Sequence, residues 1–259
     1  KVAFTGSTVV GKEIMRNAAD QVKSVTLELG GKSPAIILED AAFEEAIEGA
    51  LSGTMYNQGQ NCTATTRIYV QRSIYDQVVE TLVERAKEIQ LGAGLEKATT
   101  MGPLISKKQQ DRVLSYIEKG KEEGAQLVLG GGTGRGKGYF VEPTIFADVK
   151  DDMTIAREEI FGPVMSILPF DTVEEVIQRA NDSDYGLAAS VWTENIRKAH
   201  YITGKLQAGT VWVNDFGLEL ETMPFGGYKQ SGIGREMGGD YGLANYTEVK
   251  SVFVNMKQL

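Results

Sequence analysis

The stretch that decides the fold class is residues 34–71, PAIILEDAAFEEAIEGALSGTMYNQGQNCTATTRIYVQ. It begins with the apolar run Pro34–Leu38, which ends just before Asp40 and predicts a strand. Phe43, Ile47 and Leu51 then recur every four positions, which indicates an amphipathic helix with Asp40 as its N-cap. Arg67–Gln71 is typical of a second strand. A strand, a helix and a strand in this order predict a unit of a largely parallel sheet.

The same alternation continues on both sides of this stretch and predicts an α/β fold over most of the chain. Helices are expected over Val9–Val22, from Ser73-x-x-Asp76, over Ser106–Glu123, from Thr172-x-x-Glu175 and up to Leu206. Strands are expected over Lys1–Thr5, Val25–Leu29, Gln126–Leu129, Tyr139–Phe146, Val164–Leu168, Ala188–Trp192, Thr210–Asn214 and, as a terminal strand in need of a partner edge, Glu248–Met256.

The composition excludes several classes of protein. With 42% hydrophobic and 24% charged residues, the 259-residue chain is globular, with one large domain or two modest ones. The net charge of −8 argues against nucleic acid as a partner, and no apolar run reaches the roughly 18 residues of a membrane span. The single Cys62 excludes an internal disulfide and indicates a reducing, cytoplasmic location. The single His200 excludes a multi-histidine site, so no metal is expected.

Two glycine-rich stretches invite a phosphate-loop interpretation. Gly6–Lys12 (GSTVVGK) nearly matches such a loop, but Glu13 stands where a Ser or Thr should hold magnesium, so a nucleoside triphosphatase is a weak alternative. The amides of this turn could still receive a pyrophosphate, or it is a plain tight turn. Gly130–Gly138 lies between two predicted strands and opens no helix, which favours a hairpin connection or loop.

Cys62 and Glu28 are the residues with the clearest chemical potential. A lone cysteine is usually an inert buried residue, but the polar, glycine-bearing neighbourhood NQGQNCT suits a loop that reaches a site. As a nucleophile it would need a base or a lowered pKa, and His200 lies in a surface-type helix, so the base should be a carboxylate. Glu28 lies in an apolar strand before Gly30-Gly31, so it either faces water or has a raised pKa and a chemical role.

Taken together, segments along the whole chain resemble the aldehyde dehydrogenase superfamily. They are Phe4–Thr8, Leu27–Pro34 (LELGGKSP), Gly59–Cys62, Gly102–Leu104, Glu158–Val164 (EEIFGPV), Gly209–Asn214 (GTVWVN), Phe225–Gly232 and Tyr246–Lys250, in the family's order. The chain is most similar to the hydrolytic, non-acylating branch, which includes betaine-aldehyde dehydrogenases. The resemblance implies a three-layer α/β catalytic domain, the tail end of a Rossmann-type nucleotide-binding domain and a terminal oligomerisation strand.

The resemblance also implies a role for each matching residue. Cys62 would attack an aldehyde and form a thiohemiacetal, then a thioester once hydride has passed to NAD (NADP is not excluded). Glu28 would activate the hydrolytic water and could help deprotonate the thiol. The remaining implied site residues are Gly6 and Ser7 at the pyrophosphate, Leu29 and Glu159 beside the cofactor with Glu159 on the ribose, Phe161 near the nicotinamide and Phe225 in the aldehyde tunnel.

The resemblance implies where the domain boundaries lie and which part of a family member the chain represents. Residues 1–30 would end an NAD(P)-binding domain, 31–228 form the catalytic domain, 229–245 return towards the nucleotide-binding domain, and 246–259 form the oligomerisation strand and tail of a homodimer or homotetramer. The chain begins inside the family's nucleotide-binding domain, so it is expected to be a carboxy-terminal portion without the family's upstream oxyanion asparagine, inactive alone. Val9 also replaces a common glutamate.

Three alternatives stay open on the sequence. The first concerns substrate: Glu219 and Glu221 in the tunnel loop could attract a cationic aldehyde, or could simply be solvated. The second is a catalytically silent oligomeric member of the family. The third is an esterase or thioesterase that uses Cys62 and Glu28 without a cofactor.

Overall fold

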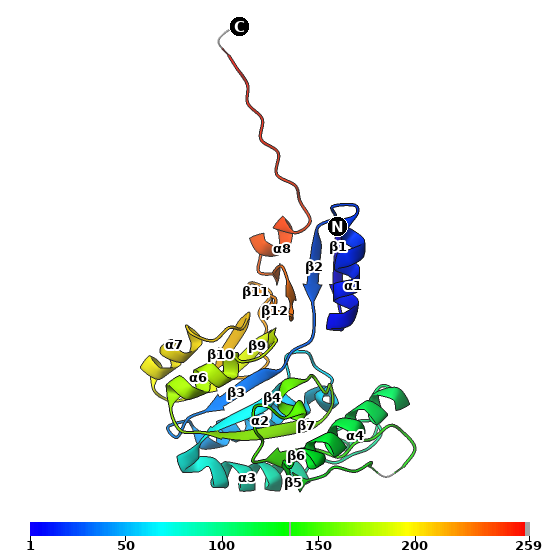
Figure 1. The fold of residues 1–259 in the computed structure, drawn as a ribbon, viewed down its shortest axis with the longest axis vertical. Helices are drawn as coiled ribbons and strands as arrows, with labels where there is room; N and C mark the ends of the chain where they lie inside the picture. The colour runs from blue at the N-terminus through cyan, green and yellow to red at the C-terminus, as the bar shows by residue number, and fades with distance from the viewer. Residues whose placement is uncertain (135, 257–259) are drawn as a thin grey trace.

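The main body of the molecule is built on a seven-stranded sheet with the order β10-β9-β3-β4-β7-β6-β5 (Figure 1). The computed structural model describes residues 1–134 and 136–256. All neighbouring strands of this sheet are parallel except β5, which pairs antiparallel with β6. The strands are β3 (Ser33–Ile37), β4 (Thr65–Gln71), β5 (Gln126–Leu129), β6 (Thr144–Ala147), β7 (Val164–Phe170), β9 (Ala188–Trp192) and β10 (Thr210–Val213).

Helices cover both faces of this sheet, which explains why β3, β7 and β9 are buried along almost their whole length. Along β3 and the residue after it, Ala35 and Ile37 join one core cluster while Ile36 and Leu38 join the other. The first cluster includes residues of α2 (Phe43–Met55) and α3 (Tyr75–Lys87). The second includes residues of α4 (Lys107–Glu122), α5 (Thr154–Arg157), α6 (Val173–Asn181) and α7 (Ile196–Thr203). The predicted three-layer α/β architecture is confirmed.

A smaller sheet pairs strands from the first 28 residues with a short strand at residues 232–233. Strands β1 (Val2–Thr5) and β2 (Val25–Glu28) are parallel and are connected by α1 (Thr8–Ala19). Strand β13 (Gly232–Ile233) lies antiparallel to β2, so the returning segment pairs with Leu27 and Glu28. The other short elements are β8 (Tyr185–Gly186) paired with β12 (Tyr228–Lys229), β11 (Pro224–Phe225) paired with β14 (Glu236–Met237), and α8 (Asp240–Ala244).

The helix starts show where sequence reasoning succeeded and failed. Thr172 and Glu175 form the predicted capping box of α6. Asp40 does not cap α2, because it accepts hydrogen bonds from Thr193 Oγ1 at 2.6 Å and Lys198 Nζ at 2.8 Å instead. The predicted cap at Ser73 is also wrong, since that residue lies in a 3₁₀ turn (Arg72–Ile74) before α3 and donates to Glu39.

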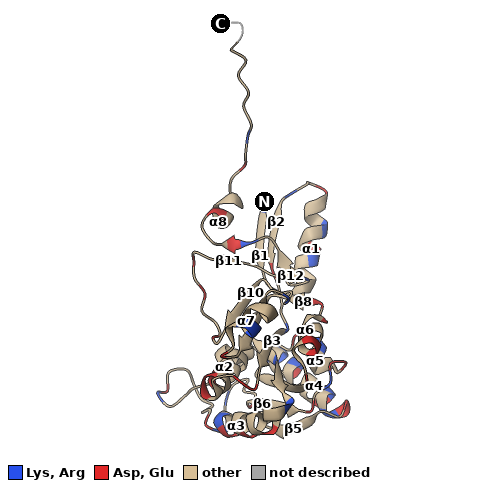
Figure 2. Cartoon of the chain, turned by 90° about the vertical axis from the view of Figure 1, so that its left-hand side faces the viewer, with Lys and Arg blue, Asp and Glu red and all other residues tan. Residues whose placement is uncertain are grey.

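The loop and tail predictions have different outcomes. Gly130–Gly138 lies between the antiparallel strands β5 and β6, as the hairpin interpretation predicted. Arg135 within it lies outside the described residues. The strand expected over Tyr139–Phe146 begins only at Thr144. Residues 248–256 form no strand within the single chain and extend away from the body with few charges (Figures 1 and 2). A terminal strand on a partner's sheet stays a prediction, as does the four-part division of the chain.

Among the described residues, no helix combines the length and the hydropathy that a transmembrane segment requires.

Candidate active site

One cavity of about 460 Å³ gathers most of the residues that the sequence singled out. It lies where the small sheet meets the main sheet, because Glu28 ends β2 and Cys62 precedes β4. Seven of the eight expected site residues line it; the full lining is Thr5, Gly6, Ser7, Glu28, Leu29, Gly30, Gln60, Asn61, Cys62, Gln109, Arg112, Glu159 and Phe161. The structure therefore brings the expected nucleophile, base and cofactor residues together. Their individual roles stay predictions.

Phe225 is the expected site residue that does not line this cavity. It belongs to β11, whose pairing with β14 places it in a second cavity of about 270 Å³ together with Trp212 and Glu219. The charge of Glu219 nevertheless acts on Cys62, because it is one of the groups that raise the pKa of that thiol. The loop that carries Glu219 thus lies near the candidate nucleophile.

The turn that carries Cys62 is shaped by glycines. Gly59 has φ +68°, and a Cβ there would meet the Gly162 carbonyl oxygen at 2.1 Å. A Cβ on Gly31 would meet the Cys62 carbonyl oxygen at 2.4 Å. Asn61 Oδ1 accepts hydrogen bonds from the Thr63 amide and hydroxyl, which closes the turn around the cysteine. The Cys62 carbonyl group can lie this close to Gly31 only because Gly31 has no side chain.

Glu28 is buried, which rejects the alternative that it faces water. It is 5% exposed, and neither carboxyl oxygen has a hydrogen-bond partner among the described residues. Burial, with a further contribution from Glu236, raises the pKa of Glu28 to about 8, against the opposing effect of Arg235. The carboxyl group is therefore mainly protonated at neutral pH and becomes a base just above it, as expected for a group tuned to accept protons.

The Cys62 thiol is not activated by its surroundings. Burial, Glu159 and Glu28 together raise its pKa to about 11, although its own backbone amide works in the opposite direction. A nucleophilic Cys62 therefore needs a base. His200 is exposed on α7 and is not among the cavity residues, so it does not supply one. Because the pKa of Cys62 lies above that of Glu28, transfer of the thiol proton to ionised Glu28 is energetically uphill.

Glu159 and Phe161 lie on one loop, and the Glu159 carboxyl group packs against the glycine pair. Glu159 Oε1 accepts a hydrogen bond from the Gly31 amide at 3.1 Å, and a Cβ on Gly30 would meet Oε2 at 2.3 Å. Burial raises the pKa of Glu159, and the Gly31 amide is the largest of the effects that lower it. Phe161 has a left-handed backbone with φ 60°.

Two residues of α4, Gln109 and Arg112, were missed by sequence reasoning. Arg112 donates to the Glu159 carbonyl oxygen at 2.8 Å, and Gln109 donates to the Phe161 carbonyl oxygen at 2.8 Å. They are three positions apart and so lie on one helix face. Nothing in their sequence neighbourhood distinguishes that face from the other polar residues of the helix.

The start of α1, which also lines the cavity, suits an anion. Ser7 caps α1, its Oγ accepting a hydrogen bond from the Val10 amide, and Gly6 donates its amide to the Glu28 carbonyl oxygen at 2.9 Å. The other amides at the start of this 12-residue helix have no partner within the helix, and the positive end of the helix dipole favours a phosphate group there. The cavity is lined by the Glu159 carboxylate and by the start of α1, and its volume of about 460 Å³ lies in the range of small-molecule and cofactor sites.

Residues 1–252 match the model of the aldehyde dehydrogenase family. The chain belongs to this family. Among the described residues, no group of three or more His, Cys, Asp or Glu could hold a metal ion.

Individual relatives agree with this assignment. The chain is 60% identical to DhaS of Bacillus subtilis (strain 168) over 257 residues, which are 99% of this chain and 52% of that protein. It is 55% identical to a betaine aldehyde dehydrogenase of Brucella anthropi over 260 residues, covering 99% and 53%. Its structure matches an aldehyde dehydrogenase of Bacillus cereus solved with NAD+, with a TM-score of 0.98, 65% identity and coverage of 99% and 52%. The chain spans about half the length of the curated relatives it matches.

Proposed function

We propose that the native protein carrying these 259 residues oxidises an aldehyde to a carboxylic acid with NAD, through a covalent intermediate on Cys62. The observation that carries the proposal is the single cavity that holds Cys62, Glu28 and Glu159 in a chain of the aldehyde dehydrogenase family. NAD is supported by the B. cereus relative and by a betaine aldehyde dehydrogenase of Staphylococcus aureus solved with NAD+ at a TM-score of 0.92 and 46% identity.

The chemistry assigned to the chain follows from the two proton-bearing groups. Glu28 in its ionised form takes the proton of the Cys62 thiol, and the thiolate adds to the carbonyl carbon of the aldehyde to form a thiohemiacetal. NAD, when bound, supplies the acceptor for the hydride that this adduct must lose to become a thioester. Glu28 releases that proton to solvent and then takes a proton from water as the water oxygen attacks the thioester carbon. The carbon–sulfur bond breaks, the carboxylic acid leaves, and Cys62 is left as a thiolate that regains a proton.

We assign the cofactor contacts to groups that lie in the same cavity. Glu159 would accept hydrogen bonds from the nicotinamide ribose, Phe161 would pack near the ring, and Leu29 would line the same side. Gly6 and Ser7 at the start of α1 would meet the pyrophosphate. Arg112 and Gln109 donate hydrogen bonds to the backbone carbonyl oxygens of Glu159 and Phe161 and so hold this loop in place.

The decisive experiment is nicotinamide reduction by the native protein with NAD and either betaine aldehyde or propanal. We expect turnover that Cys62→Ala abolishes and that His200→Ala, an exposed control, leaves intact. Cys62-dependent hydrolysis of an activated ester with no nucleotide present, and no nicotinamide reduction, would favour the esterase alternative. If the 259 residues are inactive alone and supplying the family's upstream half does not restore turnover, the proposed mechanism must be abandoned.

The substrate, location and assembly are further parts of the proposal. We propose a cationic aldehyde, supported by the second cavity, where Glu219 is close enough to act on Cys62, and by the relatives named as betaine aldehyde dehydrogenases. An unchanged preference for betaine aldehyde over propanal in the double variant Glu219→Gln and Glu221→Gln would reject this.

We also propose a cytoplasmic homo-oligomer, supported by the exposed apolar side chains of the tail: Val249, Val252, Phe253 and Val254.

A further inference from the structure

Ser231, in the turn between β12 and β13, is fully buried and joins two distant segments of the chain. It is 0% exposed. Its hydroxyl donates a hydrogen bond to the Gly30 carbonyl oxygen at 2.7 Å and accepts one from the Gly186 amide at 3.0 Å. Its own carbonyl oxygen accepts a hydrogen bond from the Leu29 amide at 2.9 Å. A hydroxyl group has a single proton, and the bond received from Gly186 leaves that proton directed at Gly30.

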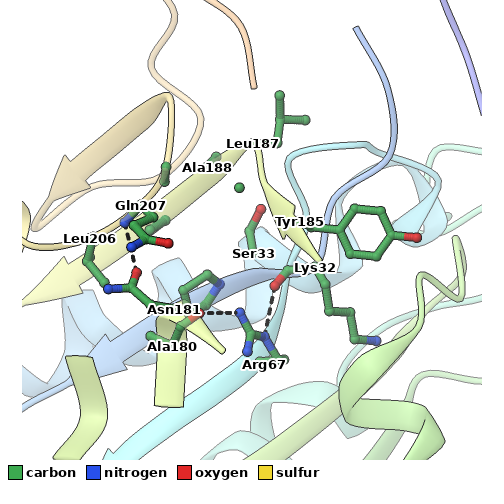
Figure 3. Close-up of a pocket in the computed structure, with 14 residues that line it drawn as sticks. Lys32, Ser33, Arg67, Ala180, Asn181, Tyr185, Leu187, Ala188, Leu206 and Gln207 are labelled. Carbon is green, nitrogen blue, oxygen red and sulfur yellow. Dashed lines mark hydrogen bonds between the residues drawn. The ribbon is translucent and has the colours of Figure 1, made fainter. Parts of the chain in front are cut away.

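Gly186 is a firm anchor, because β8 packs against the residues that follow the glycine pair. Lys32 and Ser33 line a small cavity of about 10 Å³ together with Tyr185, Gly186 and Leu187 (Figure 3). A space of this volume is about the smallest that holds one water molecule, so the two segments lie close together. The Ser231 hydroxyl is therefore attached to a well-packed part of the main body.

The backbone on either side of the glycine pair is held by hydrogen bonds. The Leu29 amide is bound as described above, and the Lys32 carbonyl oxygen accepts a hydrogen bond from Arg67 Nε at 2.8 Å (Figure 3). The peptide unit between Gly30 and Gly31 lies between these two fixed points. Because glycine has no Cβ, a peptide unit flanked by two glycines turns over against fewer steric barriers than one flanked by side chains.

The orientation of this peptide unit decides which of its groups faces Glu159. Its carbonyl oxygen, from Gly30, accepts the Ser231 hydroxyl, and its amide, from Gly31, donates to Glu159 Oε1 at 3.1 Å. If the peptide unit turned over, the Gly30 carbonyl oxygen would face the ionised carboxylate, and two acceptors would meet without a proton between them. Ser231 holds the carbonyl end and so keeps the amide end directed at the carboxylate.

We propose that Ser231 is a positioning residue that locks the Gly30–Gly31 peptide unit and thereby places the Glu159 carboxylate in the cavity. Ser231 does not line that cavity and reaches the carboxylate through this one peptide unit. The inference rests on the proposed function in one respect, the assignment of Glu159 to the nicotinamide ribose.

The first test does not depend on catalysis. Hydrogen–deuterium exchange of the native protein is followed by mass spectrometry, with fragmentation that resolves the Gly31 amide. We expect Ser231→Ala to speed exchange of that amide by about ten-fold or more, the equivalent of its one hydrogen bond to a charged group. An unchanged Gly31 exchange rate in a folded Ser231 variant overturns the inference.

Ser166→Ala is the matched control for this test. Ser166 lies in β7, is also 0% exposed, and its hydroxyl also donates to a backbone carbonyl oxygen, that of Ile155. It does not line the cavity, so we expect its loss to leave exchange at Gly31 unchanged. Ser231→Cys, which keeps the shape of the side chain but donates weakly, is the second variant in case alanine prevents folding, which circular dichroism would detect.

The second test asks whether Ser231 acts through Glu159. The dissociation constant for NAD is measured by isothermal titration calorimetry of the native protein without aldehyde. We expect Ser231→Ala made alone to raise this constant by about ten-fold. Made in Glu159→Gln, it should raise the constant by less than about two-fold, because residues that act through one shared contact are not additive. An equal effect in both backgrounds would overturn the inference, since a general loss of structure would be additive.

The two tests separate this inference from the proposed function. Cys62-dependent turnover with an unchanged Gly31 exchange rate in Ser231→Ala rejects the inference alone. Absence of turnover in the wild type, with faster Gly31 exchange in Ser231→Ala, rejects the proposed function alone. Faster Gly31 exchange with NAD binding unchanged in both Ser231→Ala and Glu159→Gln rejects the assignment of Glu159 to the ribose.

Discussion

At the scale of single residues, the cavity holds a carboxyl group and a thiol whose pKa values are both raised. Glu28, with a pKa of about 8, and Cys62, with a pKa of about 11, are both protonated at neutral pH. The negative charge that Glu28 gains on ionisation also raises the pKa of Cys62. Glu28 can therefore affect the thiol in two opposite ways, as a base that removes its proton and as a charge that retains it.

Alkylation of Cys62 distinguishes these two effects. If Glu28 is the base, Glu28→Gln slows labelling of Cys62 by iodoacetamide at pH 9 by about a hundred-fold, the lower end of the range for a positioned base. The rate is measured by mass spectrometry of the intact protein, with His200→Ala as the control. Labelling that is as fast or faster in Glu28→Gln would show that the charge effect is the larger one.

The burial of Glu28 also predicts how stability depends on pH. Its pKa is raised from 4.5 to about 8, so the folded state retains a proton that the unfolded state loses, and this contribution to stability disappears as pH rises through that window. The free energy of unfolding of Glu28→Gln relative to the wild type should increase between pH 5 and pH 9, by up to about 4 kcal/mol. Urea unfolding at both pH values measures it. A constant difference would mean that Glu28 is not buried in its protonated form.

At the scale of elements, helix starts offer a matched pair of variants. Thr172→Ala removes the side chain that caps α6, so we expect a loss of about 1 kcal/mol in the free energy of unfolding. Ser73→Ala changes a residue with the same sequence signature that caps nothing, and we expect a loss of at most a few tenths of a kcal/mol. Urea unfolding of both variants checks the pair. Equal losses would contradict the capping role.

The loop between β2 and β3 gives a second element-scale prediction. In Gly30→Ala the new methyl group would overlap the Glu159 carboxylate, so we expect the KM for NAD to rise about ten-fold or more through loss of the ribose hydrogen bonds. Gly94→Ala is the control, because a Cβ there meets nothing within 4 Å. Steady-state kinetics over a range of NAD concentrations measure both variants. An unchanged KM in a folded Gly30→Ala would argue against Glu159 as a cofactor ligand.

The elements show why sequence reasoning reached the architecture but not its details. Apolar runs such as Pro34–Leu38 predict buried strands because both of their faces meet helices, and this signal is local. The caps at Asp40 and Ser73 were wrong because their side chains bind partners far away in the sequence. Gln109 and Arg112 were missed for the same reason, since the loop that they hold lies about 50 residues further along the chain.

At the scale of the whole molecule, the exposed tail predicts association. Val252 and Val254 are 74% and 71% exposed and lie two positions apart, as neighbours on one face of a strand would. We expect Val252→Asp with Val254→Asp to shift the native protein to a smaller oligomer or a monomer. Light scattering coupled to gel filtration checks this, with Leu95→Asp, also at an exposed apolar position, as the control. An unchanged mass would contradict the oligomerisation strand.

The pairing of β13 with β2 has a consequence for how the protein is made. This pairing places Gly232 opposite Glu28, and the Ser231 hydroxyl donates to the Gly30 carbonyl oxygen at 2.7 Å. The part of the cavity wall formed by Glu28 and Gly30 therefore depends on residues about 200 positions further along the chain. A ribosome that adds about 5–20 residues per second needs roughly 10–40 s to cross that interval. The helices and parallel strands of the main body emerge meanwhile, so the nascent chain acquires its core before Glu28 acquires its surroundings.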